Sequence, residues 1–393
     1  VYINGQKVGY WPYGYNSFYF DITKYLKPGE KNTLAVRLEN LPESSRWYPG
    51  AGLYRNVHLI ITEDAYIPVW GTYITTPSVN EKFAKVNVRT KVVLPEGADP
   101  AKYSVETSVW NPNKQKLTAV RTSLAQMKYN NDLAEQEFVI QDPSLWSPEM
   151  PALYSAETRL YEGDKLKDTY TTPFGIRSIE IIPDKGFFLN GKRTVFKGVC
   201  NHHDLGPLGA AVNDAAIRRQ IRILKDMGCN AIRTSHNMPA PELIRACDEM
   251  GMMIMAESFD EWNVAKCKNG YNLLFDEWAE KDLVNLLHNF RNNPSVVMWC
   301  IGNEVPNQWN EGDCKIAKWL QDICHREDPT RPVTQGMDAP DAVVNNNFAA
   351  VMDVAGFNYR PFKYKINYKK LPQRIVLGSE TASTVSSRGV YKF

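Results

Sequence analysis

The sequence predicts a multidomain protein in which two β-rich segments precede an α/β barrel. Three observations support this fold class. The chain has 393 residues, more than one hydrophobic core usually organises, so two or three domains are expected. Short strand patterns fill the first part of the chain, and strand patterns alternate with helix patterns in the rest. The pattern changes twice, which places the domains at residues 1–64, 65–182 and 183–393.

The first segment is predicted to form half of a β-sandwich. It opens with VYING, in which Asn4-Gly5 is typical of a tight hairpin turn. The stretch FYFDITKYLKPGEKNTLAVRLEN follows, and its Lys27-Pro28-Gly29 separates two strand-like runs.

The second segment is predicted to be a seven-stranded immunoglobulin-like sandwich. Alternating runs such as KVNVRTKVVL, YSVETSVWN and LYSAETRLYEG are bounded by Pro, Gly, Asn and Asp, and no helical period interrupts them. The proline-containing IIPDKG is interpreted as a linker to the third segment.

The third segment carries seven predicted strands: TVFKGVCN, NAIRTSH, MMIMAES, SVVMWCIGNE, PVTQG, DVAGFNY and RIVLGSE. After the first of these, Asn213 and Asp214 can cap a helix that presents Ile217, Ile221 and Leu224 on one face. Further helices fit PELIRACDEMG, FDEWAEKDLVNLLHNFRN and GDCKIAKWLQDICHRE. Alternation of this kind predicts a parallel α/β barrel.

Composition excludes several classes of protein. Lys and Arg number 46 against 44 Asp and Glu, so nothing favours nucleic acid or an anionic membrane as a partner. No apolar run reaches the roughly 18 residues of a membrane span. The seven cysteines contain no CxxC spacing, which argues against a zinc site or a disulfide framework and predicts free, mostly buried thiols. The compartment is left open.

Two predicted strands end in a glutamate, Glu304 in SVVMWCIGNE and Glu380 in RIVLGSE. The carboxyl ends of barrel strands converge, so residues far apart in sequence can meet there. A retaining glycosidase needs two carboxyl groups about 5 to 5.5 Å apart, one ionised and one protonated. A glutamate at a strand end is usually a solvated charge or an ion-pair partner, but a position directly after a fully buried strand favours the catalytic interpretation.

The chain also resembles a known family. The segments SRWYPGAGLYRNV, GVCNHHD, NAIRTSHNMP, DEMGMMIMAESFDEW, NPSVVMWCIGNEV and GSETAST are similar to those of glycoside hydrolase family 2, which includes β-galactosidases, β-glucuronidases and β-mannosidases. The resemblance implies a sugar-binding-type jelly roll, an immunoglobulin-like sandwich and a (β/α)₈ barrel, of which seven strands are present. It is strongest to β-galactosidase-type members from gut bacteria. It further implies that the chain begins within the jelly roll and stops before the eighth strand.

The resemblance also implies roles for individual residues. Glu304 resembles the general acid/base and Glu380 the nucleophile. Asn303 resembles the residue that binds the sugar 2-hydroxyl, and Tyr359 the one that donates to the nucleophile. Three further residues are expected to line the sugar subsite: His236, His202 and Asp204.

No metal or cofactor is expected. In AESFDEW, Asp260 and Glu261 occupy the region where some family members bind magnesium, but the histidine of those sites is absent. His202 and His203 are adjacent, and neighbouring residues on an extended strand point to opposite faces, so both cannot easily hold one ion.

Two tryptophans, Trp262 and Trp309, could stack on sugar rings, although packing is the commoner role of tryptophan in a large domain.

The expected function is therefore that of a retaining exo-β-glycosidase, foremost a β-galactosidase. The alternatives are a β-glucuronidase or β-mannosidase, a related barrel enzyme that cleaves inside polysaccharides, and a non-catalytic carbohydrate-binding protein. The expected partner is a carbohydrate, and a homo-oligomer is a further expectation because oligomers are common in the family. A bacterial origin is implied, without a choice between periplasm and cytoplasm.

Overall fold

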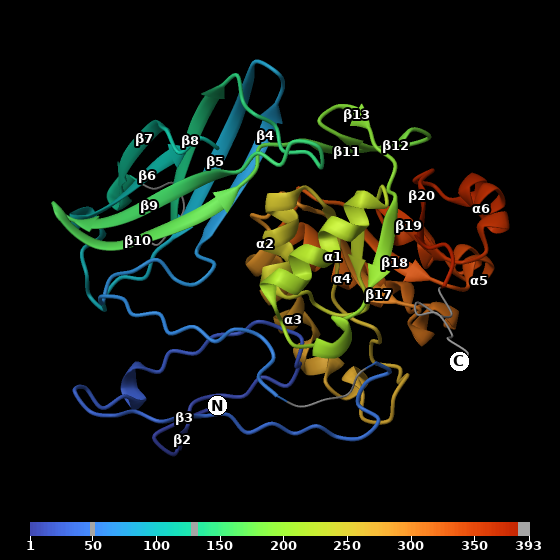
Figure 1. Ribbon diagram of the computed structural model, residues 1–393, viewed down its shortest axis with the longest axis horizontal. Coiled ribbons are helices and arrows are strands. Elements are labelled where there is room, and N and C mark those ends of the chain that lie inside the picture. Colours follow the sequence, from blue (N-terminus) through green and yellow to red (C-terminus); the bar gives the residue numbers. More distant parts are fainter. Residues whose placement is uncertain (48–51, 127–132, 384–393) are drawn as a thin grey trace, which may run out of the picture.

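The computed structural model describes residues 1–47, 52–126 and 133–383 (Figure 1). Part of SRWYPGAGLYRNV, the last residue of GSETAST and the end of the third predicted domain lie outside the described residues. A β-sandwich lies on one side of the molecule and a parallel sheet surrounded by helices on the other, while the N-terminal segment runs along one edge of both. The predicted multidomain fold class is confirmed.

All seven predicted barrel strands form, and they pair in chain order as one parallel sheet, β14-β15-β16-β17-β18-β19-β20. The thiol of Cys200 on β14 donates to the carbonyl of Ser379 on β20 at 3.3 Å, so the two outer strands of this sheet approach each other. The strands span Gly198–Asn201, Ala231–Thr234, Met253–Glu257, Val296–Asn303, Val333–Met337, Val354–Asn358 and Val376–Glu380.

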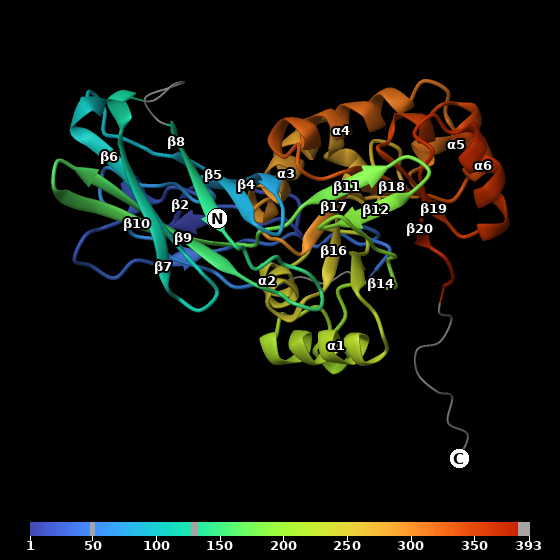
Figure 2. The same ribbon diagram turned by 90° about the horizontal axis from the view of Figure 1, so that it is seen from above.

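Helices cover the outside of this sheet, with α1 and α2 on a different side from α3 and α4 (Figure 2). Asn213 caps α1 as predicted, since its side chain accepts from the backbone N–H of Ala216, and Ile217, Ile221 and Leu224 are the buried residues of the helix. The short helices α5 and α6 are not among the predicted ones. The helices are α1 Asp214–Asp226, α2 Pro241–Met250, α3 Phe275–Phe290, α4 Cys314–Glu327, α5 Pro340–Asn345 and α6 Tyr364–Lys370.

In the described residues the sandwich has the predicted seven strands, in sheets of three (β4-β5-β8) and four (β10-β9-β6-β7), all with antiparallel pairing. Strict alternation explains the fold: Ala84, Val86 and Val88 of β5 are fully buried while the residues between them face outward. The strands are β4 Thr72–Val79, β5 Phe83–Lys91, β6 Tyr103–Trp110, β7 Lys116–Ser123, β8 Leu133–Gln141, β9 Tyr154–Glu162 and β10 Lys165–Phe174.

The N-terminal segment holds one small sheet, formed by β1 Tyr2–Ile3, β2 Gln6–Lys7 and β3 Leu34–Ala35. The predicted hairpin is present, with Asn4 and Gly5 at φ of +52° and +80°. The prediction of two long strands on either side of Lys27-Pro28-Gly29 was wrong. Within residues 18–40 the structure forms one strand, β3, because a strand requires a second backbone to pair with.

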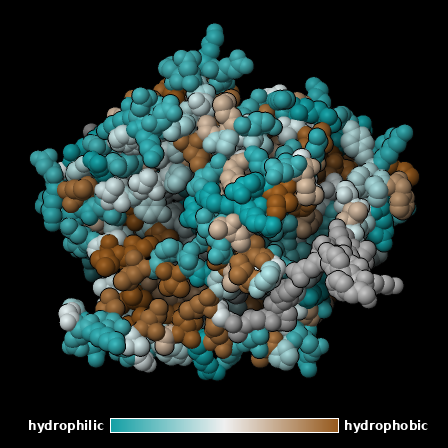
Figure 3. All heavy atoms as spheres, in the orientation of Figure 1, coloured by the Kyte–Doolittle hydropathy of each residue, from teal (hydrophilic) through white to brown (hydrophobic). Residues whose placement is uncertain are grey.

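Instead of pairing, the residues after β2 attach the N-terminal segment to the barrel. The Trp11 indole donates to Asp282 of α3 at 2.8 Å, and the Tyr13 hydroxyl lies 2.9 Å from Asn237 and donates to the Ser258 carbonyl at 2.7 Å. Apolar surface gathers in the part of Figure 3 where Figure 1 draws this segment; Leu59, Ile60 and Ile61 are among its exposed residues.

The predicted linker IIPDKG was wrong as well. It is the turn of a β-hairpin in which β11 Ile179–Ile182 pairs with β12 Gly186–Leu189, followed by the short β13 Lys192–Arg193. Four apolar side chains of the hairpin pack against barrel strands: Ile179, Ile181, Phe187 and Leu189. The sequence pattern alone could not distinguish such a hairpin from a linker. The division of the chain at residues 64 and 182 remains a prediction.

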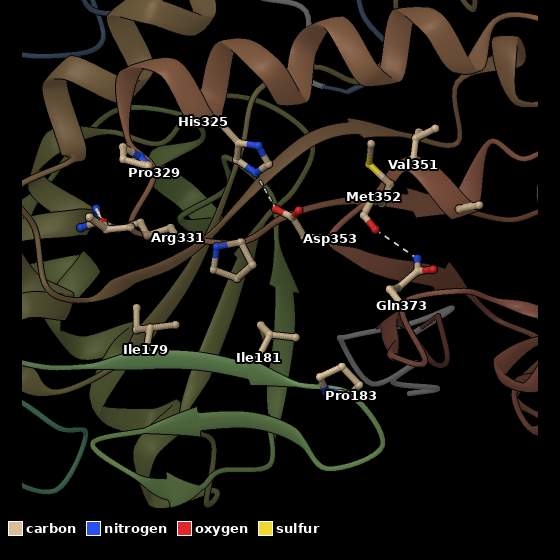
Figure 4. A pocket seen from close by; sticks show the side chains of 13 residues that line it. Ile179, Ile181, Pro183, His325, Pro329, Arg331, Val351, Met352, Asp353 and Gln373 are labelled. Carbon is tan, nitrogen blue, oxygen red and sulfur yellow. Dashed lines mark hydrogen bonds and ion pairs between the residues drawn. The ribbon is translucent and has the colours of Figure 1, made fainter. Parts of the chain in front are cut away.

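A cavity of about 620 Å³ lies where β11 faces the barrel. Ile179 and Ile181 line it on one side, and Pro332 and Asp353 line it directly before β18 and β19 begin (Figure 4). It therefore opens at the amino ends of the barrel strands, whereas barrel enzymes carry their active sites at the carboxyl ends.

None of the helices in the described part of the chain combines the length and the apolar character that a membrane span requires.

Candidate active site

The two glutamates singled out from the sequence both lie at the carboxyl edge of the barrel sheet. Glu380 ends β20 and is in register with Asn358 at the end of β19. Glu304 follows β17 directly, and its backbone N–H donates to the Gly336 carbonyl of β18 at 2.7 Å. Glu304 and Tyr359 have φ of +42° and +58°, a conformation that non-glycine residues adopt at a cost and that concentrates at functional sites.

Glu380 is held by two donors. The Tyr359 hydroxyl donates to its Oε2 at 2.6 Å, and the Arg233 guanidinium donates to its Oε1 at 2.7 Å. The hydrogen bond to Glu380, together with burial, raises the pKa of Tyr359 to about 12, so the phenol keeps its proton at neutral pH. Two donors of this kind hold a carboxyl group in one orientation.

Glu304 has a different environment. Its Oε1 accepts from the Asn358 side chain at 2.9 Å. Burial raises the pKa of Glu304, the negative charges of Asp338 and Glu380 raise it further, and the Asn358 hydrogen bond and the Lys266 charge oppose the shift without cancelling it. A raised pKa suits a carboxyl group that must deliver a proton.

Asn303 links the two glutamates. Its side chain is almost fully buried, and its Oδ1 accepts from Arg233 at 2.9 Å and from Asn358 at 3.1 Å. Arg233 is also bound to Glu380, and Asn358 is also bound to Glu304. One hydrogen-bonded network therefore includes Asn303 and both predicted catalytic glutamates.

Behind this network lies a buried carboxylate, Glu257 at the end of β16. It accepts from Arg233 at 2.6 Å, and one of its oxygens lies 2.7 Å from Nδ1 of His236. Burial lowers the pKa of His236 to about 2, helped by the charge of Arg233, so the imidazole is neutral. Nε2 of the same ring lies 3.5 Å from Glu380, so the imidazole stands between two carboxyl groups, and its tautomer decides which nitrogen donates.

His202 and His203 point to different neighbours. The His202 ring lies 4.9 Å from the Trp47 ring and 5.0 Å from the His236 ring, whereas the His203 ring lies 4.9 Å from Tyr15. Among the residues that the structure describes, no hydrogen-bond partner reaches the buried Nδ1 of His202. An unsatisfied buried nitrogen near the predicted catalytic carboxylates is what a ligand hydroxyl would complete.

The remaining predicted positions are less tied to the network. Asp204 accepts from the backbone N–H of Gly206 at 2.7 Å, and its place in a sugar subsite stays a prediction. Trp262 is fully buried, donates to the Ile301 carbonyl and stacks near Phe348, so it packs the core rather than facing a ligand. Trp309 is 63 % exposed.

Several residues of the site were missed by sequence reasoning. Arg233 and Glu257 had a usable signal: the first is a charge inside a buried strand, and the second ends its strand as Glu304 and Glu380 do. The only sequence signal for Asn358 was its position directly before Tyr359. Arg46 and Trp47 lie in SRWYPGAGLYRNV, one of the segments that resemble the family, but no local pattern connects that segment with the carboxyl edge of the barrel.

Arg46 donates twice to Asp260, at 2.8 and 2.7 Å, and Asp260 in turn accepts from Asn303. In the described part of the chain, no group of three or more His, Cys, Asp or Glu side chains is arranged to hold a metal ion. All seven cysteines are free thiols, but the prediction that most are buried was wrong: only Cys247, Cys300 and Cys324 are buried, and the other four are partly exposed.

Two family models match the chain. The family model described as Glycosyl hydrolases family 2, TIM barrel domain, matches residues 180–392, and that described as Glycosyl hydrolases family 2 matches residues 66–177. The β-galactosidase BoGH2A of Bacteroides ovatus is 39 % identical over 100 % of this chain and 50 % of its own length. A β-glucuronidase of Bacteroides fragilis is 32 % identical over 85 % of this chain and 50 % of its own length.

Among solved structures, a glycosyl hydrolase family 2 member from Bacteroides cellulosilyticus superposes with a TM-score of 0.91 at 36 % identity, covering 97 % of this chain and 49 % of that one. The chain thus spans about half the length of these relatives.

Proposed function

The chain belongs to glycoside hydrolase family 2, and from this premise we propose that it carries the catalytic centre of a retaining exo-β-glycosidase. The observation that carries the proposal is the contrast between the two glutamates of one network. Glu380 is bound by the donors Arg233 and Tyr359, whereas the pKa of Glu304 is raised by burial. A nucleophile and a general acid require this contrast.

In the proposed first step, a Glu380 oxygen attacks the anomeric carbon while Glu304 transfers its proton to the departing glycosidic oxygen. The product is a covalent glycosyl ester on Glu380. In the second step Glu304, now ionised, takes a proton from water as the water oxygen displaces Glu380 from the anomeric carbon. Two inversions give retention of configuration.

Asn303 and Tyr359 support these steps. The Asn303 amide donates to the sugar 2-hydroxyl, a contact that strengthens as the ring gains oxocarbenium character. The Tyr359 hydroxyl fixes one oxygen of Glu380, which leaves the other in contact with Arg233. The ring nitrogens of His236 and His202 contribute hydrogen-bond partners for sugar hydroxyls.

A β-galactoside is the proposed substrate class. It is supported by the Bacteroides ovatus β-galactosidase, which aligns with all of this chain. The cations Arg233, Arg46 and Lys266 each already pair with a carboxylate, which also suits an uncharged sugar.

A β-glucuronide is the second candidate. A putative β-glucuronidase of Formosa agariphila aligns with 100 % of this chain at 35 % identity, beside the Bacteroides fragilis β-glucuronidase.

The test is hydrolysis of aryl β-galactoside, β-glucuronide, β-mannoside and β-glucoside by the full-length protein. Glu380→Gln and Glu304→Gln are expected to abolish turnover, while Glu277→Gln, an exposed glutamate on α3, serves as the matched control and keeps it. The anomeric configuration of the first product, read by NMR, is expected to match that of the substrate. A folded protein that turns over none of the four glycosides refutes the proposal, and retained sugar binding would then favour a carbohydrate-binding protein.

A further inference from the structure

The N-terminal segment reaches the active site through Arg46. Its guanidinium grips Asp260 with two hydrogen bonds and lies over the Trp47 ring, 4.1 Å from the ring centroid. The Asp260 side chain is only 13 % exposed, against 35 % for Arg46. Bidentate pairing of this kind fixes the direction of a carboxylate as well as its charge.

Asp260 passes this constraint to Asn303. Its Oδ1 accepts from Arg46, from Lys266 at 3.0 Å and from the Asn303 amide at 3.1 Å. Lys266 also donates to the Asn303 carbonyl at 2.6 Å. Burial acts to raise the pKa of Asp260, but the hydrogen bond from Arg46 and the charge of Lys266 outweigh it and lower the pKa, so the carboxylate remains ionised.

The partners of Asn303 determine which way its amide points. Arg233 can only donate and Asp260, ionised, can only accept, so Oδ1 must face Arg233 and Nδ2 must face Asp260. One N–H of Nδ2 goes to Asp260, and one N–H is left. Asn303 can therefore act toward a sugar only as a donor, in one direction.

The loop that carries Lys266 is built to hold this arrangement. The buried Glu261 accepts backbone N–H groups from Lys266, Cys267 and Asn272, which closes the loop around one carboxylate. The same loop touches the N-terminal segment again: Asn269 donates from its side chain to the Pro42 carbonyl at 2.7 Å and from its backbone to the Glu43 carbonyl at 3.0 Å. The N-terminal segment and the loop thus meet at two places, through Arg46 and Lys266 at Asp260 and through Asn269 at residues 42 and 43.

We propose that Arg46 is a positioning residue: through Asp260, it makes the aim of Asn303 at the substrate depend on the docking of the N-terminal segment. The inference rests on the proposed function, since it concerns the 2-hydroxyl contact of the same site. Arg46 does not touch the reacting atoms. Its effect is confined to substrates that carry the group to which Asn303 donates.

The test uses the full-length protein and two substrates, the aryl β-glycoside that the wild type hydrolyses and its 2-deoxy analogue. For Arg46→Gln, kcat on the parent glycoside is expected to fall about 10- to 100-fold, the range for a catalytic contact displaced by about 1 Å. KM changes less than the kcat. On the 2-deoxy analogue the loss is expected to be under about 3-fold, because the contact is already missing.

Two further variants separate positioning from folding. Arg46→Lys keeps the charge without the bidentate grip and is expected to recover part of the lost rate. Arg37→Gln, which removes an exposed arginine of the same segment, is the matched control and leaves both rates unchanged. An equal loss on both substrates, or no loss on either, overturns the inference while leaving the proposed function in place.

A structural readout is independent of turnover. In a crystal structure of Arg46→Gln, the Asp260 carboxylate is expected to leave Asn303 Nδ2. A preserved contact overturns the inference even if the protein hydrolyses none of the glycosides tested.

Discussion

Replacing Tyr359 with phenylalanine removes one of the two donors on Glu380, together with the hydrogen bond between the same hydroxyl and Ser383. The ring stays, and the lost group is a hydroxyl 2.6 Å from Glu380 Oε2. Arg233 still binds Oε1 at 2.7 Å, so the carboxylate keeps one partner and gains freedom to rotate. The variant therefore measures what orienting the nucleophile contributes.

The magnitude follows from the type of hydrogen bond. A bond to a charged group contributes roughly 1.5 to 3 kcal/mol. If this is lost in the transition state of glycosylation, the rate falls roughly 10- to 150-fold, since about 1.4 kcal/mol corresponds to a factor of ten. Because the pKa of Tyr359 is raised to about 12, the wild type should show no titration of this phenol below about pH 10.

The assay is the rate at which a 2-deoxy-2-fluoro glycosyl fluoride traps Glu380 as the covalent ester, which isolates the first step. Tyr364→Phe is the matched control: its hydroxyl donates to the Phe357 carbonyl at a longer 3.3 Å, and its loss should leave the trapping rate unchanged. A Tyr359→Phe protein that traps the inhibitor at more than a third of the wild-type rate, with unchanged thermal stability, would refute the assigned role.

Three other predictions follow from the same structure. The pKa of Glu304 is raised and its protonated form is the acid, so the rate of glycosylation should fall as pH rises through that pKa. Glu304→Ala should abolish this decline at high pH and should spare substrates with a dinitrophenolate leaving group, which needs no proton. Pre-steady-state rates measure both effects. Burial raises the pKa of Asp248 to about 6, so its protonation stabilises the fold below about pH 4 and this contribution is lost as pH rises to 6; Asp248→Asn should flatten that part of the plot of unfolding midpoint against pH, and an unchanged slope would contradict it. Trp262→Ala should lower the free energy of unfolding by about 3 to 5 kcal/mol, against under about 0.5 kcal/mol for the exposed Trp309→Ala, measured by denaturant titration.

Local patterns were enough for the barrel and the sandwich. Six of the seven barrel strands end at a polar residue, β18 being the exception at Met337, and the strands of the sandwich alternate with a period of two. Both patterns reflect burial, which acts on each segment separately. The same logic found the Asn213 cap, since a cap depends on residues only three positions apart.

Local sequence patterns gave wrong predictions where the conformation of a segment depends on a second segment that packs or pairs with it. The stretch after residue 17 has apolar alternation but forms only β3, while IIPDKG has turn residues and forms a hairpin that packs with the barrel. Strand formation requires a second backbone, and no local run encodes where that backbone lies.

For the site itself, the sequence by itself determined which side chains end the barrel strands: Asn303, Glu304, Tyr359 and Glu380. Strand ends are local, and the parallel topology brings them to one edge. Only the tertiary structure determined the pKa shifts and the side-chain orientations of these groups. Arg233 pairs with carboxylates 24 and 147 positions away, and Arg46 pairs with Asp260 214 positions away. Such pairings depend on distances in space and on the exclusion of water, and neither is written in the spacing of residues along the chain.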